Sequence, residues 1–159
     1  MHKDLLEAIG RIVHNFAVLE HQLGIMGHSL IGIQNQTFTN CILAELSFKN
    51  LINLVVSLHA QRDRRAVIHT ELKEHTKRAY DIETRRNQII HSIWSGLIEE
   101  PVAMRMKKTA KGKLQWQTEE LRTSDLNDFS NSIATLIKDL ESFMRMQSYD
   151  FLKEEIRLK

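Results

Sequence analysis

The chain has 159 residues, a length typical of one domain, and 42% hydrophobic residues, which suffices for one core. Its formal net charge of +2 is compatible with nucleic acid but does not require it. The single cysteine, Cys41, excludes an internal disulfide, and no apolar stretch approaches the roughly 18 residues of a membrane span. We therefore expect a cytoplasmic protein with one domain over residues 1–159, and its single Pro and six Gly favour helices.

The first predicted helix covers roughly residues 3–31. Its apolar residues are spaced alternately by four and three, which indicates a helix packed lengthwise in a bundle or across a dimer. Glu20 lies seven residues after Val13, at a position where its equivalents are apolar. It is therefore either a half-buried carboxylate or a side chain turned to water. The apolar seam consists of Leu5, Ile9, Ile12, Phe16, Leu19, Leu23, Met26 and Leu30.

Three histidines, His14, His21 and His28, repeat on the opposite face of this helix. Residues seven apart are separated by about 10.5 Å along a helix axis, so one metal ion cannot bridge them. We expect a solvated or dimer-facing stripe, and neither a metal site nor a cofactor.

A second helical region is predicted over residues 38–61, within which Ser47 is placed to cap a fresh helix. A third helix is predicted from Ala66 to Ser95, ended by Gly96 and Pro101.

From residue 102 to residue 117 the apolar period changes to two, which predicts a β-hairpin with its turn at 109–113. The basic residues of this hairpin, Lys111 and Lys113 among them, occur with no acidic residue between them. The segment is therefore either a finger that contacts phosphates or a solvated tip.

The last long helix is predicted to be capped by Thr123 or Ser124, with Asp125 and Asp128 in its first turn. Together these elements predict a mainly all-α fold, an antiparallel four-helix bundle with a β-hairpin inserted between helices three and four. The apolar seam of the last helix consists of Leu126, Phe129, Ile133, Leu136, Ile137, Leu140, Phe143 and Met144.

Most of the chemistry is concentrated near the end of the third predicted helix. Arg86 projects from an apolar stripe, where a charge is costly unless it is paired or faces a wet pocket. Asn87 and His91 are four residues apart and share one edge of the helix, with Trp94 close to the same edge. The segment thus places a cation, an amide, an imidazole and an indole at the border of a buried face.

This element, Arg86-Asn87-x-x-x-His91 in a four-helix plan, resembles the HEPN superfamily, many of whose members are metal-independent ribonucleases. The family pattern is Arg, four to six residues, then His, often with Asn after the Arg. Arg64 and His69 share the spacing but lack the polar residue. The resemblance implies that Arg86, Asn87 and His91 are catalytic and that two protomers pair so that their motifs flank one cleft.

The resemblance further implies an RNA substrate, a homodimer, and a role related to toxins or defence, with a cognate antitoxin or another partner protein. The residues that we expect to contact the substrate are Arg85, Trp94, Lys111 and Lys113.

RNA cleavage without a metal needs a base for the 2′-hydroxyl and an acid for the leaving 5′-oxygen, and a histidine can serve either step. An arginine can offset the charge that develops on the phosphate. On a straight helix Arg86 and His91 lie about 140° apart, so they converge through the reach of Arg86, a helix distortion or a second copy.

The alternative is a non-catalytic module of the same fold that binds a nucleotide or a protein. In that case Arg86 only pairs with Glu20 or Glu45, and Asn87 and His91 satisfy one another.

Overall fold

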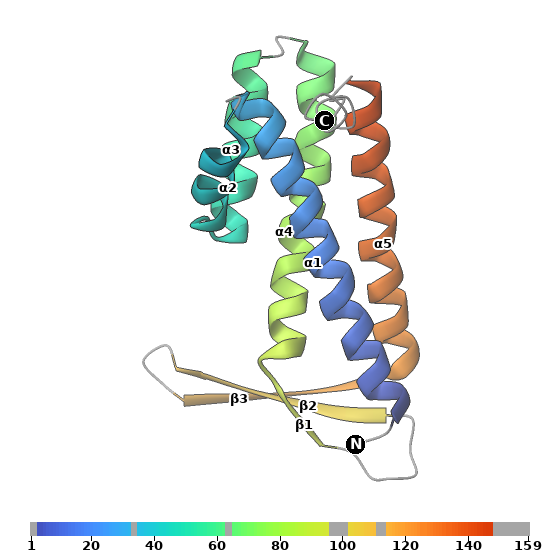
Figure 1. The fold of residues 1–159 in the computed structure, drawn as a ribbon. Coiled ribbons are helices and arrows are strands. Elements are labelled where there is room, and N and C mark those ends of the chain that lie inside the picture. Colours follow the sequence, from blue (N-terminus) through green and yellow to red (C-terminus); the bar gives the residue numbers. More distant parts are fainter. Residues whose placement is uncertain (1–2, 33–34, 63–64, 96–101, 111–113, 148–159) are drawn as a thin grey trace. The chain divides into compact units, whose positions relative to one another are not determined.

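The computed structural model describes residues 3–32, 35–62, 65–95, 102–110 and 114–147. For the strand residues from 95 to 118 it describes the backbone but not the side chains. Over these residues the chain is mainly helical, as predicted, with five helices and three strands (Figure 1). The helices are α1 (Lys3–Ile31), α2 (Gln36–Ala44), α3 (Phe48–Arg62), α4 (Ala66–Ile90) and α5 (Thr123–Met146). The strands are β1 (Ile93–Ser95), β2 (Val102–Ala110) and β3 (Leu114–Arg122).

The chain divides into two compact units. Unit 1 comprises Met1–Ala17 and Asp81–Ala134, and unit 2 comprises Val18–Tyr80 and Thr135–Lys159. The helices α1, α4 and α5 each contribute one part to each unit.

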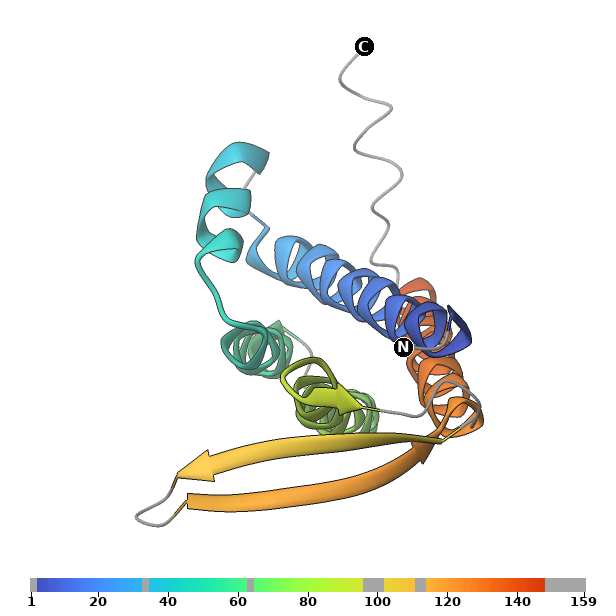
Figure 2. The ribbon, with the colours of Figure 1, turned by 90° about the horizontal axis from the view of Figure 1, so that it is seen from below.

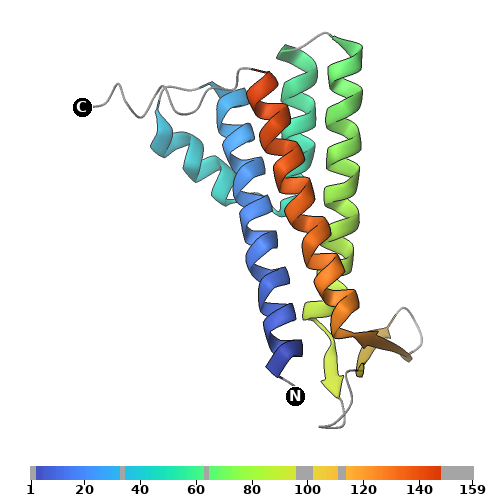
Figure 3. The same cartoon turned by 90° about the vertical axis from the view of Figure 1, so that its right-hand side faces the viewer.

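In unit 1, the first half of α1 packs beside the first half of α5. Arg11 donates from Nη2 to Asn127 Oδ1 at 2.7 Å, and Asn15 donates from Nδ2 to Ser130 Oγ at 3.0 Å. The residue numbers rise together along both helices, so α1 and α5 run in the same direction here (Figure 3). The expected antiparallel arrangement is therefore wrong for this pair. The buried residues of unit 1 include Leu5, Ile12, Phe16, Ile82, Ile89, Leu126 and Ile133.

The sheet of unit 1 has the order β1-β2-β3, with both pairs antiparallel (Figure 2). Strands occur where the period of two predicted them, but β3 continues beyond residue 117 to Arg122, immediately before α5. β1 was expected to be the end of the third helix, and this expectation is wrong. The spacing of Ile89 and Ile93 fits a helix, yet Ile93–Ser95 pairs with Met104–Met106 of β2.

The start of α5 is held by an acidic side chain of its first turn. Asp125 Oδ2 accepts a hydrogen bond from the Arg122 backbone N–H at 2.8 Å. The helix begins at Thr123, so the capping position is Arg122, one residue before the first predicted candidate.

In unit 2, α4 runs opposite to both α3 and α5. Tyr80 of α4 contacts Asn53 of α3, and the rings of His69 and His59 stack further along, with centroids 5.7 Å apart. Arg78 of α4 pairs with Asp139 of α5 at 2.6 Å. His75 lies edge-on to the Phe143 ring, at 5.8 Å between centroids.

The region predicted as a second helical segment is divided into α2 and α3. Ser47 Oγ accepts from the Asn50 N–H at 3.3 Å, which confirms the predicted cap inside this region. A Cβ added at Gly27 of α1 would lie 3.2 Å from Leu43 of α2 and 3.5 Å from Leu51 of α3. The chain therefore turns back along α1 before α3 begins.

Because α2 provides this reversal, α3 runs in the same direction as α1 within unit 2. Arg62, at the end of α3, donates to the carbonyls of Ser29 and Ile31 at 3.3 and 3.4 Å. Gly32 follows α1 with a φ of 66°, and a side chain there would meet the Arg62 guanidinium. Among the described residues, no helix combines the length and apolarity that a bilayer crossing demands.

Candidate functional site

The last turns of α4 in unit 1 carry the predicted motif. Arg85 forms a bidentate ion pair with Glu119 of β3, with Nη2 2.8 Å from Oε1 and Nη1 3.0 Å from Oε2. The two side chains are 32% and 35% exposed. Arg85, which was expected to contact substrate, is thus committed to a carboxylate that ties α4 to the sheet.

Arg86 is partly buried, and its partners among the described residues of unit 1 are neutral. Its Nη1 donates to Asn87 Oδ1 at 2.9 Å, and its guanidinium carbon lies 4.9 Å from the centroid of the Phe16 ring. Its Nε is buried with no hydrogen-bond partner. Among the described residues of unit 1, no carboxylate forms an ion pair with Arg86. The side chain is positioned by an amide oxygen and an aromatic face.

Glu20, the first-choice partner of Arg86, is exposed and belongs to unit 2. Of the two alternatives for Glu20, the half-buried carboxylate is wrong and the side chain turned to water is the one observed. Glu45, the second choice, is also exposed and lies just after α2. The ion pair between Arg86 and either residue stays a prediction.

The residues that follow α4 satisfy its last carbonyl groups. The His91 N–H donates to the Asn87 carbonyl at 3.1 Å, and the Ser92 hydroxyl donates to the Gln88 carbonyl. The Trp94 indole Nε1–H donates to the Ile89 carbonyl at 2.9 Å. Helix ends leave the last four carbonyls without intrahelical partners, and these three contacts satisfy three of them, so they cap the end of α4. The indole N–H of Trp94, which was expected to contact the substrate, is used in this cap.

His91 lies just beyond the end of α4 and is exposed. Because the helix ends at Ile90, the direction of the His91 side chain is not set by the helical period. Asn87 Oδ1 accepts a hydrogen bond from Arg86, and Asn87 and His91 are joined by a hydrogen bond between their backbones. The structure thus brings Arg86 and Asn87 together, with His91 as an exposed imidazole at the C-terminal end of the helix.

The two remaining predicted site residues, Lys111 and Lys113, fall between β2 and β3, outside the described residues. Their contact with RNA stays a prediction.

Two side chains that contact the arginines of this site were not identified from the sequence, namely Glu119 and Phe16. The sequence could have indicated Glu119 as a partner for a basic residue, since it is the first acidic residue after the basic hairpin. Its backbone partner on β2 is Arg105, so the carboxylate falls in register with a basic position. Phe16 was assigned only to the apolar seam, because a seam pattern does not show which cation lies over a ring.

Within the described part of the chain, no group of three or more His, Cys, Asp or Glu side chains is placed to hold a metal ion. Comparison with protein-family models, with curated proteins and with solved structures gave no match for this chain.

Proposed function

We propose that this protein is a metal-independent RNA endonuclease whose site is centred on Arg86 and His91. The observation that carries the proposal is the state of Arg86, a partly buried cation whose contacts within described unit 1 are the Asn87 amide and the Phe16 ring. Because these partners are neutral, they do not compensate the positive charge of the guanidinium, which can therefore bind a phosphate. The exposed imidazole of His91 follows one residue after the helix end.

In this mechanism His91 takes the proton of the 2′-hydroxyl or gives a proton to the leaving 5′-oxygen. The 2′-oxygen forms a bond to phosphorus while the bond from phosphorus to the 5′-oxygen breaks. Arg86 offsets the charge on the phosphate, and Asn87 holds the guanidinium in position. The products are a cyclic 2′,3′-phosphate and a 5′-hydroxyl.

One histidine cannot hold both roles in the same step, so the proposal includes a homodimer in which two motifs share one cleft. The motif resemblance to HEPN ribonucleases supports this part. The frame is a four-helix bundle of α1, α3, α4 and α5 that carries the inserted hairpin. A cytoplasmic location suits the lone Cys41, and a toxin- or defence-related role with a cognate antitoxin completes the proposal.

A second function is favoured by the contacts at the helix end. Trp94, Ser92 and the His91 backbone all cap α4, and Arg85 is paired with Glu119. These contacts stabilise the end of α4 and its attachment to the sheet, so most of the motif has a structural role that does not involve RNA. The same fold would then be a non-catalytic module that binds a nucleotide or a protein.

The test is cleavage of single-stranded RNA by the purified protein in EDTA, with the product ends identified. His91→Ala should lose cleavage by roughly 10²–10⁴-fold while keeping the melting temperature, because an exposed imidazole contributes little to packing. His14→Ala is the matched control, since His14 is another exposed histidine of unit 1.

Full cleavage by a folded His91→Ala protein would remove the assigned site. An absence of cleavage in the wild-type protein would leave the non-catalytic module.

The basic hairpin provides a separate measurement. Replacing Lys111 and Lys113 by Ala should weaken RNA binding and reduce its dependence on salt, because fewer counterions are released. An unchanged salt dependence would show that the hairpin tip does not contact phosphates.

A further inference from the structure

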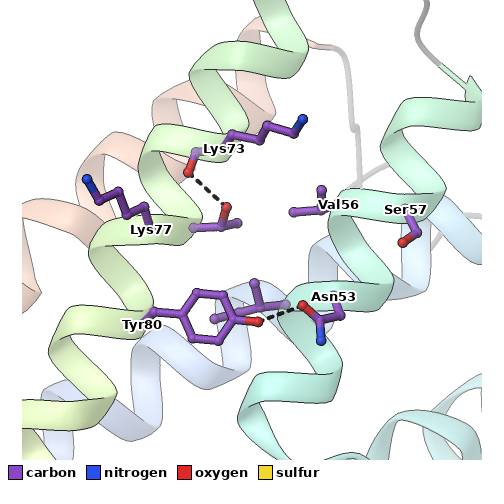
Figure 4. Close-up of a pocket in the computed structure, with 8 residues that line it drawn as sticks. Asn53, Val56, Ser57, Lys73, Lys77 and Tyr80 are labelled. Carbon is purple, nitrogen blue, oxygen red and sulfur yellow. Dashed lines mark hydrogen bonds between the residues drawn. The ribbon is translucent and has the colours of Figure 1, made fainter.

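A cavity of about 350 Å³ that is open to solvent lies between α3 and α4 in unit 2 (Figure 4). Its apolar wall is formed by Ile52 and Val56 of α3. Ser57 contributes a hydroxyl, and Lys73 and Lys77 of α4 complete the lining. In Figure 4 the Lys73 ammonium extends toward α3, whereas the Lys77 ammonium is turned away from it. The cavity therefore combines apolar surface with positive charge, the combination that suits an anion attached to an apolar body.

One end of this cavity is held in place by Tyr80. In Figure 4 its ring extends from α4 toward Asn53 of α3, and its hydroxyl lies 2.6 Å from Asn53 Oδ1. Because the tyrosine donates to that oxygen, the Asn53 Nδ2 hydrogens are not used in this bond. The two helices thus present a fixed aromatic ring and an amide donor at the same edge.

The two lysines have no acidic partner among the described residues. Lys73 and Lys77 are exposed and one helical turn apart, and no ion pair of the described chain includes them, although Glu74 lies between them. Arg78, the next residue, differs because it pairs with Asp139 at 2.6 Å. Neither lysine is thus held in an ion pair within the described fold, and both can contact a negatively charged ligand.

We propose that this cavity binds a phosphate monoester carried on a flat ring system, as in a nucleoside monophosphate or the 5′-phosphorylated end of an RNA. The phosphate, with up to two negative charges, binds Lys73, and the flexible Lys77 side chain, one turn further along α4, rotates to reach it. The ring packs on Tyr80 and the apolar wall, and Asn53 Nδ2 donates to its polar edge. The volume is at the lower end of the range for small-molecule sites.

This site is independent of Arg86 and His91, since none of its residues takes part in the proposed cleavage. The experiment is calorimetric titration of the full chain with adenosine 5′-monophosphate, adenosine, inorganic phosphate, and a short RNA with either a 5′-phosphate or a 5′-hydroxyl. The monophosphate should bind at least about tenfold more tightly than adenosine, because each charge-assisted contact is worth about that factor.

The variant Lys73→Ala/Lys77→Ala should weaken binding of the monophosphate by at least about tenfold. Lys138→Ala/Arg145→Ala is the matched control, because it removes two charges from exposed positions of α5 in the same unit. It should leave the affinity unchanged. Tyr80→Phe keeps the ring but loses the bond to Asn53, and should have an intermediate effect.

Tighter binding of the free monophosphate supports a nucleotide as the natural source, and selective binding of the 5′-phosphorylated RNA supports an RNA end. Equal losses in the two double variants would overturn the proposal, since they would indicate general attraction by charge. The absence of binding by every phosphorylated probe would overturn it as well. Retained binding in His91→Ala would separate this site from the cleavage site.

Discussion

The helix α4 carries cations in two settings that differ in how the charge is held. Near its end, in unit 1, Arg85 pairs with Glu119, and Arg86 contacts Asn87 and Phe16. In its first half, in unit 2, Lys73 and Lys77 border a cavity without an ion pair among the described residues. The first pair of charges is part of the packing, whereas the second pair is free to meet a ligand.

This difference determines how a loss of function should be interpreted. A variant of Arg85 or Arg86 changes stability together with any binding, so lost activity alone does not identify a catalytic group. A variant of Lys73 or Lys77 removes a solvated charge, so binding that is lost there but kept in Lys138→Ala/Arg145→Ala is evidence of contact. Four measurements test this contrast.

The largest stability effect is expected at Arg86. Arg86→Ala removes a charge-assisted hydrogen bond and the contact with Phe16, which together should cost about 2–3 kcal/mol of unfolding free energy. Chemical denaturation measures this value. Arg86→Lys keeps a cation but loses the planar fork, and should be intermediate. A wild-type midpoint for Arg86→Ala would show that this arginine is not held by its neighbours.

A smaller loss is expected at Trp94. Trp94→Phe retains most of the aromatic surface but leaves the Ile89 carbonyl without its indole donor, at a cost of about 1.5 kcal/mol. Hydrogen exchange at the last turn of α4 should accelerate in this variant. If exchange there is unchanged, the indole does not cap the helix.

The ion pair between Arg85 and Glu119 should be weaker still. A double-mutant cycle with Arg85→Ala and Glu119→Ala should give a coupling of about 1 kcal/mol, because both side chains are about one third exposed while the geometry is bidentate. High salt should reduce the coupling. A value of zero would mean that water and other partners replace the pair at no cost.

The smallest effect is expected at the cavity. The double variant Lys73→Ala/Lys77→Ala should change the free energy of unfolding by less than about 0.5 kcal/mol, as is usual for surface positions. Thermal and chemical denaturation both measure it. A loss of unfolding free energy comparable with that of Arg86→Ala would show that these lysines stabilise the fold, and that they do not differ from the arginines in this respect.

The helical seams were predictable because their periodicity is long and regular. Leu19, Leu23 and Met26 of α1 are fully buried, as are Ile133, Leu136 and Phe143 of α5. The cap at Ser47 was also found, since a hydroxyl before an apolar run is a local signal. Local patterns of this kind depend only on neighbouring residues.

The contacts of the candidate site were less predictable because they join distant residues. The choice of Glu119 as partner of Arg85 depends on where β3 lies, and 34 residues separate the pair. The end of α4 was misplaced because Ile93 continues the helical spacing, whereas pairing with β2 decides its conformation. The direction of α5 relative to α1 followed from the break between α2 and α3, which the apolar pattern alone did not resolve.

Unit 1 is assembled from two stretches that are distant in the sequence, Met1–Ala17 and Asp81–Ala134. Its contacts between Asn15 and Ser130 span 115 residues, so the first half of α1 leaves the ribosome long before its partner on α5 has been made. The loop closed by this contact spans most of the chain, and its closure is entropically costly. Completion of unit 1 is therefore expected as a late event in biosynthesis, after translation has passed residue 130.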